Sequence, residues 1–345
     1  MTSPRVSVIV PCFNREAYIG EAVKSILAQN LGDLEILVVD DGSTDASTDV
    51  VDSFDDPRVR LVRNERNLGI PATRNRGLDL ARGDYIATLD SDELAEPGRL
   101  ERQVAFLDAR ADIALVGSWA REVTEAGAAT GKIKRRPTDP DEIDLWLLFR
   151  CAVLQYTMTG RAEVLRDYRY NEDLEVCEDH DLLLRLSADG HRLANLPEAL
   201  VSHRVHDSQV TREKALRLIA RKHAIVGRRL EELGVAHRPE DLERHFDLAH
   251  LRSRGIAPDA AYLDWAEDWL LRLIEAFARR DAAGAVTARR IGAELWLAAC
   301  WHAKARLGPT RWIGRCFASP LAGPLWRSAL VRLPVVRRNA PAAGD

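Results

Sequence analysis

Two aspartates one residue apart, Asp90 and Asp92, end a run of residues from 84 that is typical of a buried strand. Residues i and i+2 of an extended segment share a face, so both carboxylates are expected to point the same way. Such a pair suits a hard cation such as Mg²⁺ or Mn²⁺, which could carry a diphosphate. An isolated pair of this kind also commonly caps the turn and helix that follow it, so the choice depends on the rest of the chain.

A second pair of acids, Asp40 and Asp41, ends the strand-like run at 34–40 and leads into a Gly-Ser-Thr-Asp turn. These acids could also do no more than cap a helix. In open α/β sheets, ligands bind beyond the carboxyl ends of the strands, which is where both acidic pairs are expected. Two independent pairs at strand ends favour a binding site over helix capping.

The elements that would position these acids alternate along the chain. We predict strands at 6–11, 34–40, 59–63, 84–88 and 113–118, and helices at 14–29, 71–81, 97–109 and 174–189, with Asn14 as the first N-cap. This alternation predicts an α/β fold with a mostly parallel sheet between two layers of helices. Residues 119–158 are expected to form loops around a short buried helix at 145–149. Residues 212–307 are helical in character, so domains are expected at 1–211 and 212–345.

Composition excludes several classes of protein. The chain has 345 residues and a net charge of -4, and no stretch reaches the ~18 apolar residues of a membrane span. The five cysteines are odd in number, widely spaced and without a C-x-x-C pair, which argues against disulfides or zinc and favours a reducing cytoplasm. The N-terminus enters a strand pattern directly, so no signal peptide is expected. No nucleic-acid partner is expected.

The C-terminal part is basic. From residue 289 onward the only acids are Glu294 and Asp345, against ten arginines and lysines. Short basic and apolar pieces separated by Gly and Pro are typical of segments that lie on a membrane surface. A helical hairpin packed on the first domain is the alternative. The protein is thus expected to be cytoplasmic, with peripheral contact at the inner membrane face.

Several short motifs occur in a fixed order. They are Pro11 after a V-S-V-I-V strand, Val39-Asp-Asp-Gly-Ser43, Asn67-Leu-Gly69 leading to Thr73-Arg-Asn75, Asp90-Ser-Asp92, Glu178-Asp-His-Asp181 and Arg204-Val-His206. Each motif is weak alone, but the ordered set resembles the family-2 glycosyltransferases of GT-A fold over about residues 5–211. Residues 212–345 lie outside the resemblance, and could face an acceptor or a membrane.

The resemblance implies a nucleotide-sugar donor, a UDP-sugar being favoured, and transfer of a hexosyl or N-acetylhexosaminyl group with inversion. It also implies Mn²⁺ or Mg²⁺ as cofactor and a role in cell-envelope polysaccharide synthesis. The metal would be held by Asp92, helped by Asp90 and His206, and Asp90 could instead reach the ribose. Asp41 would accept the N3 hydrogen of uracil or thymine. The remaining nucleoside contacts would come from Pro11, Asn67 and Arg74, although Arg74 could be only a surface charge.

For inversion, one base must remove the proton of the acceptor hydroxyl. The resemblance places that base at Asp179, with Glu178 orienting it or contacting a glycan, polysaccharide or lipid-linked acceptor. Asp181 is four residues before Arg185, which predicts an ion pair instead. The diphosphate would be covered by a segment holding three more residues of the site, Arg204, His206 and Thr211. Here the sequence departs from the family, which often has Ser where this chain has Gln209. His203 is an alternative to His206 in this role, because both are expected in a loop near the site.

Two other functions fit part of the pattern. A nucleotidyltransferase also uses acids at strand ends and a metal, but no glycine-rich, lysine-containing phosphate loop follows the first strand. An inactive nucleotide-sugar-binding scaffold would tolerate loss of the acids, yet Asp41, Asp92 and Asp179 are all present. A dinucleotide oxidoreductase is disfavoured because the sequence lacks G-x-G-x-x-G.

Overall fold

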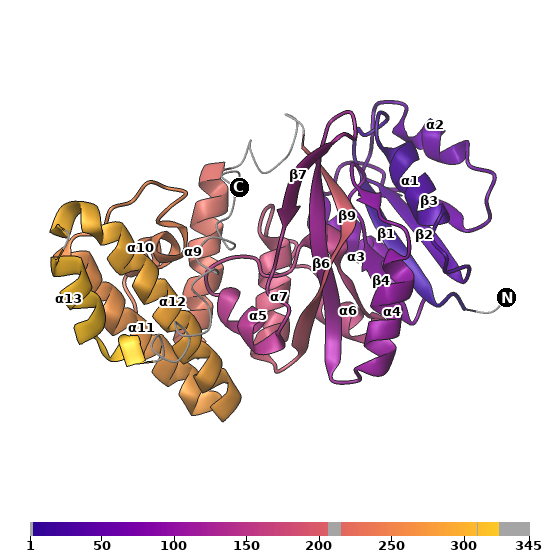
Figure 1. Ribbon diagram of the computed structural model, residues 1–345. Coiled ribbons are helices and arrows are strands. Elements are labelled where there is room, and N and C mark those ends of the chain that lie inside the picture. Colours follow the sequence, from indigo (N-terminus) through magenta and orange to yellow (C-terminus); the bar gives the residue numbers. More distant parts are fainter. Residues whose placement is uncertain (1–2, 206–214, 309, 324–345) are drawn as a thin grey trace. The chain divides into compact units, whose positions relative to one another are not determined.

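The computed structural model describes residues 3–205, 215–308 and 310–323 (Figure 1). It divides into two compact units. Unit 1 comprises Met1–Leu147 and Cys151–Lys222, and unit 2 comprises Leu148–Arg150 and His223–Asp345.

Unit 1 is built on a nine-stranded sheet with the order β3-β2-β1-β4-β8-β6-β9-β5, and β7 pairs with β6 off this path. The strands are β1 (Val6–Cys12), β2 (Leu34–Asp40), β3 (Val59–Arg63), β4 (Tyr85–Thr88), β5 (Leu94–Ala95), β6 (Ile113–Thr124), β7 (Ala129–Lys134), β8 (Thr159–Arg161) and β9 (Arg192–Val205). The helices are α1 (Ile19–Leu27), α2 (Ser47–Asp52), α3 (Ile70–Leu80), α4 (Arg99–Ala109), α5 (Pro140–Trp146), α6 (Ala162–Tyr168) and α7 (Glu178–Ala188).

The predicted α/β class is confirmed, and the parallel part of the sheet is its first half. β1 pairs in parallel with β2 and β4, and β2 pairs in parallel with β3. Beyond β4 the sheet is mixed, because β8 runs antiparallel to both β4 and β6, whereas β6 and β9 are parallel. The parallel half brings the carboxyl ends of β1, β2 and β4 to one edge, where both predicted acidic pairs follow their strands.

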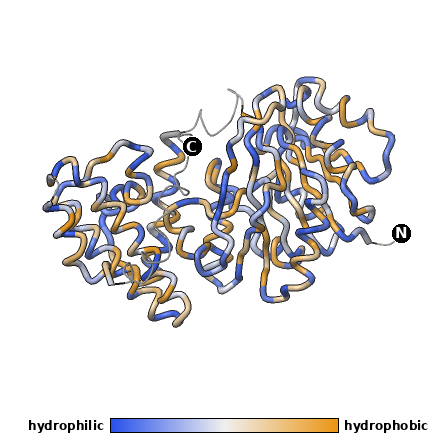
Figure 2. Tube along the Cα trace, in the orientation of Figure 1, coloured by the Kyte–Doolittle hydropathy of each residue, from blue (hydrophilic) through white to orange (hydrophobic). Residues whose placement is uncertain are grey.

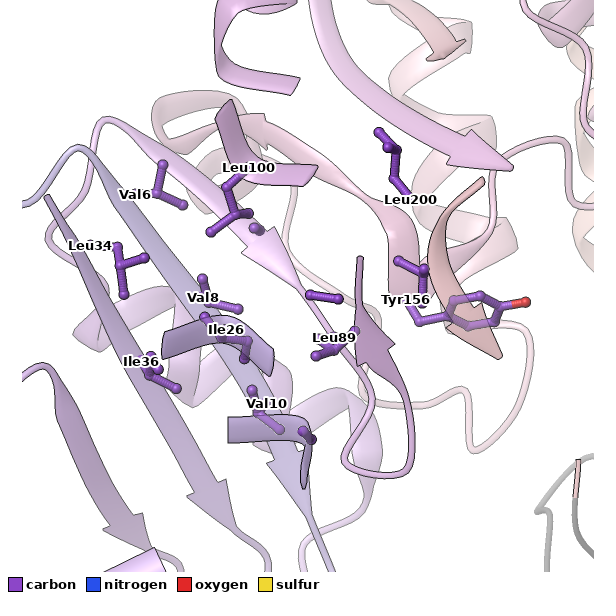
Figure 3. Close-up of a cluster of buried hydrophobic side chains, with 14 of the residues drawn as sticks. Val6, Val8, Val10, Ile26, Leu34, Ile36, Leu89, Leu100, Tyr156 and Leu200 are labelled. Atoms are coloured by element: carbon purple, nitrogen blue, oxygen red, sulfur yellow. The ribbon is translucent and has the colours of Figure 1, made fainter. Parts of the chain in front are cut away.

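The core of unit 1 lies against this parallel half. Figure 3 shows Val6, Val8 and Val10 along β1 beside Leu34 and Ile36 of β2, all at most 4% exposed. Strands buried on both faces favour such β-branched runs. On the side of α3, Gly77 allows close packing, because a Cβ there would lie 2.5 Å from Cγ2 of Ile9.

Three local predictions differ from the structure. Asn14 does not cap a helix: its φ is +52°, its Oδ1 accepts a hydrogen bond from the Thr44 amide at 2.8 Å, and α1 starts only at Ile19. Residues 119–158 are not only loops, because β6 continues to Thr124 and forms a hairpin with β7. The short helix lies at Pro140–Trp146 instead of 145–149, where Asp139 caps it.

The helical character predicted after residue 212 is found in α9 (Ala215–Glu232), which crosses the boundary between the units, and in α10 (Pro239–His250), α11 (Ala260–Arg280), α12 (Ala282–Leu307) and α13 (Arg311–Ala318). Hydrophilic and hydrophobic residues alternate along these helices (Figure 2). Trp269 of α11 and Trp296 of α12 are among the largest fully buried side chains of the described residues. In the described part of the chain, no helix is long and apolar enough to cross a membrane.

Candidate active site

The turn after β4 carries Asp90 and Asp92. The strand ends at Thr88, as predicted, but the Glu93 amide donates to the Asp90 carbonyl at 3.1 Å, so the two acids lie in a turn and not in the extended segment that was assumed for them. The two acids are nevertheless close enough to repel each other: burial raises the pKa of Asp90, and the charge of Asp92 adds to the rise, against the opposing charge of Arg74. The Asp90 side chain is 33% exposed and that of Asp92 is 14% exposed.

Arg74 links this turn to α7. Its guanidinium donates to Oδ1 of Asp90 at 3.0 Å and to Oε1 of Glu178, and it stacks 5.5 Å from the ring centre of Tyr170. The Arg74 side chain is only 6% exposed, so it is no surface charge. Its neighbour Asn75 fixes the same region by bonding the Tyr170 backbone through both its amide atoms. Arg74 thus holds the strand-end acids and the first turn of α7 together.

The first turn of α7 presents Glu178 and Asp179. Burial raises the pKa of Glu178, with Arg74 opposing the rise and Asp179 adding to it. Asp179 is partly exposed, and its Oδ2 lies 3.6 Å from the Cys151 thiol. The predicted ion pair is confirmed, since Nε of Arg185 lies 2.7 Å from Oδ2 of Asp181.

Asp41 is tied to residues 64–69. Its Oδ1 accepts from the Asn64 side chain and the Leu68 amide, both at 2.8 Å, and its Oδ2 accepts from the Gly69 amide at 2.9 Å. Gly69 is the residue that precedes α3, so Asp41 supplies acceptors at the start of that helix. Asn67 is exposed in the same loop, whereas Pro11 lies in β1 opposite Val39.

The Asp40 side chain accepts hydrogen bonds from the turn that follows it. Its Oδ2 accepts from the Gly42 and Ser43 amides at 3.2 and 3.1 Å. Its Oδ1 is buried, and no hydrogen-bond partner for it is found among the described residues. Capping of the turn, the simpler interpretation of this acid, therefore applies to Asp40.

Arg204 reaches the Asp92 turn from β9. It is 4% exposed, its Nε donates to the Asp92 carbonyl at 3.2 Å, and it pairs with Glu21 at 2.6 Å. Its own amide donates to Oε2 of Glu93 at 3.0 Å, while Oε1 of Glu93 is 2.6 Å from Nδ1 of His203. His203 therefore bonds Glu93, the residue that directly follows Asp92.

Sequence reasoning missed Glu93, Arg15 and Arg99. Arg15 Nε lies 3.7 Å from Oδ2 of Asp92. Arg99 is fully buried and donates to the Thr88 carbonyl at 2.7 Å, and burial lowers its pKa to about 9. Glu93 directly follows the Asp90-Ser-Asp92 motif, which was a usable signal. His206 and Thr211 lie outside the described residues.

The donor set at the turn fits a divalent cation. Two neighbouring carboxylates that keep part of their surface exposed provide hard oxygen ligands, and the charge of Asp92 contributes to the raised pKa of Asp90. Within the described ranges, no group of three or more His, Cys, Asp or Glu side chains is placed to hold a metal. Such a cation would therefore take its other ligands from outside this group, as Mg²⁺ usually does from phosphates and water.

Comparison with known proteins identifies the family. The model for Glycosyl transferase family 2 matches residues 7–168. A glycosyltransferase of Haemophilus influenzae, itself uncharacterized, is 35% identical over 219 residues, which span 60% of this chain and 68% of the relative. The succinoglycan biosynthesis protein ExoO of Rhizobium meliloti is 31% identical over 302 residues, or 82% of this chain and 80% of ExoO.

Solved structures agree on the fold. S. aureus TarS 1–349 in complex with UDP-GlcNAc matches with a TM-score of 0.58 and 18% identity, over 89% of this chain and 93% of TarS. The sheet order, the acids at the strand ends and these likenesses lead to one assignment. The chain belongs to glycosyltransferase family 2 and is a glycosyltransferase with the GT-A fold.

Proposed function

We propose that the enzyme is an inverting, metal-dependent glycosyltransferase. It moves one hexosyl or N-acetylhexosaminyl group from a nucleotide diphosphate sugar to a hydroxyl of a glycan, polysaccharide or lipid-linked acceptor. The observation that carries the proposal is the Arg74 bridge, because it places the acids after β4 beside the first turn of α7. Leaving-group and acceptor chemistry require acids at two such adjacent positions.

The donor nucleoside would lie beside Asp41. An ionised carboxylate offers about four lone-pair sites, and Asp41 uses three of them on Asn64, Leu68 and Gly69. One site remains, which suits a single N–H donor such as N3 of uracil. We also propose nucleoside contacts by Pro11, Asn67 and Arg74. Because Arg74 bonds Asp90 and Glu178, its position favours a contact nearer the diphosphate than the base. TarS was solved with UDP-GlcNAc, so UDP-sugars are the first donors to test.

The cation, Mn²⁺ or Mg²⁺, would be held by Asp90 and Asp92, with His206 as a further proposed ligand. When bound, it would offset negative charge on the departing diphosphate. Arg204 and Thr211 are proposed to contribute to the same diphosphate site.

Asp179 is proposed as the general base. It accepts the proton of the acceptor hydroxyl while that oxygen bonds the anomeric carbon and the carbon–diphosphate bond breaks on the opposite face, which inverts the configuration. Glu178 is suited to orientation because Arg74 already holds its carboxylate. Asp179 has no such ion pair among the described residues, and it is partly exposed.

The setting is proposed to be cell-envelope polysaccharide synthesis at the cytoplasmic face of the inner membrane. ExoO, a relative aligned over most of both chains, is named for succinoglycan biosynthesis. A lipid-linked acceptor would require the enzyme to work at a membrane surface.

Donor binding is tested by the melting temperature with UDP, dTDP, GDP and their sugars, with and without Mn²⁺. A ligand at about 100 times its Kd stabilises the folded state by ~2.7 kcal/mol. We expect a Mn²⁺-dependent rise with uridine ligands that is lost in Asp92→Asn. Asp84→Asn is the matched control, since Asp84 precedes the same strand and its side chain is 63% exposed. No rise with any nucleotide would contradict the proposal.

Catalysis is tested by nucleotide release in the presence of acceptor. Asp179→Asn should lower kcat by roughly 10²–10⁴-fold, the usual contribution of a general base, with donor binding unchanged. Asp173→Asn, an exposed acid shortly before α7, is the control. Retention of configuration at the anomeric carbon by NMR, or full activity of Asp179→Asn, would refute the assigned mechanism.

A further inference from the structure

Unit 2 exposes aromatic side chains at the end of α12 and along α13. Trp301 and Phe317 are each 50% exposed and Ile313 is 41% exposed. The rings of Trp301 and Trp312 meet edge to face at 5.6 Å. Large exposed apolar side chains that gather in one place mark an interaction surface more often than scattered ones do.

These side chains are exposed although α13 is firmly attached. The Trp296 indole N–H donates to the Cys316 carbonyl at 3.1 Å, and Arg315 pairs with Asp264 and Glu267. Cys316 is fully buried on the attached side. Ile313 and Phe317 are four residues apart, so they lie on one face of the helix, and both are exposed.

Basic side chains occur in the same segment, and one of them contacts an aromatic ring. Lys304 Nζ lies 3.7 Å from the centre of the Trp301 ring, and Arg306 and Arg311 are exposed. Residues 295–323 contain no Asp or Glu. We call Trp301, Lys304, Arg306, Arg311, Trp312, Ile313 and Phe317 the aromatic–basic patch.

We propose that the aromatic–basic patch binds the surface of a bilayer that contains anionic phospholipids. Trp side chains favour the level of the headgroups, where an apolar body and a polar N–H are both accommodated. An apolar helix face can enter the boundary between headgroups and acyl chains while neighbouring lysines and arginines bind anionic headgroups. The patch combines these features on residues 301–317, and a surface rich in positive charge is complementary to an anionic leaflet.

The test is flotation of the full-length protein with vesicles of phosphatidylglycerol and phosphatidylethanolamine, compared with phosphatidylcholine vesicles. We expect binding to the anionic vesicles only, weakened by ~0.5 M salt as screening predicts. Trp301→Ser with Phe317→Ser should lower the partition coefficient about tenfold, and each of Lys304→Glu and Arg306→Glu roughly fivefold or more. Trp301→Phe should retain most of the binding.

Val286 and Arg289 supply a matched control. They lie fifteen residues before Trp301 and Lys304 on the same helix, about 22 Å away along its axis, and both are exposed. Val286→Ser with Arg289→Glu should bind vesicles as the wild type does. All variants change exposed positions, and an unchanged melting temperature verifies that they fold.

Three results would overturn the proposal. The first is equal binding of the patch variants and the wild type, which would assign binding to residues outside the patch, such as 324–345. The second is no binding of the wild type to anionic vesicles. The third is self-association of the wild type that the patch variants abolish without any effect on lipid binding, which would make the patch a contact between copies. Vesicle binding needs no donor sugar, so failure of the transferase proposal would leave this test unaffected.

Discussion

Replacing Arg74 by methionine should destabilise unit 1 by an amount that grows with pH. Arg74 is 6% exposed and neutralises Glu178, whose side chain is 11% exposed. Removing one partner of a buried pair typically costs ~3–5 kcal/mol. Asp90 is 33% exposed, so its share is reduced by water, and we expect a loss of about 3 kcal/mol at pH 8. In domains of about 150–250 residues this lowers Tm by roughly 6–12 °C.

The pH dependence follows from the sign of the pKa shift. Burial already raises the pKa of Glu178 above its ordinary 4.5, and removing Arg74 raises it further. When the folded-state pKa of a carboxyl group is raised, its protonation favours the folded state at low pH. This contribution to the free energy of unfolding is lost as pH rises through the folded-state pKa. The Arg74→Met substitution should therefore cost less stability at pH 5 than at pH 8.

Urea unfolding of Arg74→Met and the wild type at pH 5, 6, 7 and 8 measures this difference. Arg102→Met is the control, because Arg102 pairs with Glu198 where both side chains are about half exposed, and it should change stability by less than ~1 kcal/mol. An equal loss at every pH, or a loss below about 1 kcal/mol at pH 8, would refute the view that Arg74 compensates a buried carboxylate.

Three further predictions concern other buried polar groups. Burial opposes ionisation of Glu35, but hydrogen bonds from Arg82, Ser7 and Arg60 outweigh it and lower the pKa to about 2. This carboxylate should therefore stabilise the fold by ~3 kcal/mol above pH 4.5 and lose that contribution towards pH 2. Urea unfolding of Glu35→Gln should show the loss of stability at pH 7. Burial lowers the pKa of His245 to about 4, so unit 2 should lose stability as pH falls from 6.5 to 4, with a smaller slope in His245→Asn. Asp41→Ala leaves three N–H donors without their acceptor and should cost ~2–4 kcal/mol, with faster hydrogen exchange at residues 64–69 than in the wild type.

The parallel half of the sheet could be predicted because its signals are local. β1, β2, β3 and β4 are short β-branched or apolar runs, each followed by turn residues. The strand β9 was missed because Pro197 lies inside it. Its pairing with β6 passes from Leu196 opposite Ser118 to Ala199 opposite Trp119, so Pro197 and Glu198 fall in an irregularity of the ladder. A proline in such a position hides a strand from pattern analysis.

The site could be predicted as a set of residues but not as an arrangement. Arg74 bonds Asp90 and Glu178, which are 16 and 104 residues away in sequence, and no local pattern reports such pairs. The same holds for Glu93, whose partners His203 and Arg204 are 110 and 111 residues away. The ordered motifs indicated which side chains gather, whereas their partners depend on packing over long sequence separations.

The acids of the site fall into two groups that loss of activity alone would not separate. Asp41 and Glu93 are almost fully buried, and both carboxyl oxygens of each are hydrogen-bonded to protein groups. Replacing either one leaves buried donors unpaired and must lower stability even without substrate. Asp90 and Asp92 keep part of their surface exposed and repel each other, so neutralising one relieves repulsion in the free protein. If a substitution at Asp92 abolishes binding of the nucleotide-sugar without lowering Tm, it would therefore indicate that Asp92 contacts the ligand. Loss of nucleotide-sugar binding after a substitution at Glu93 would not indicate such a contact.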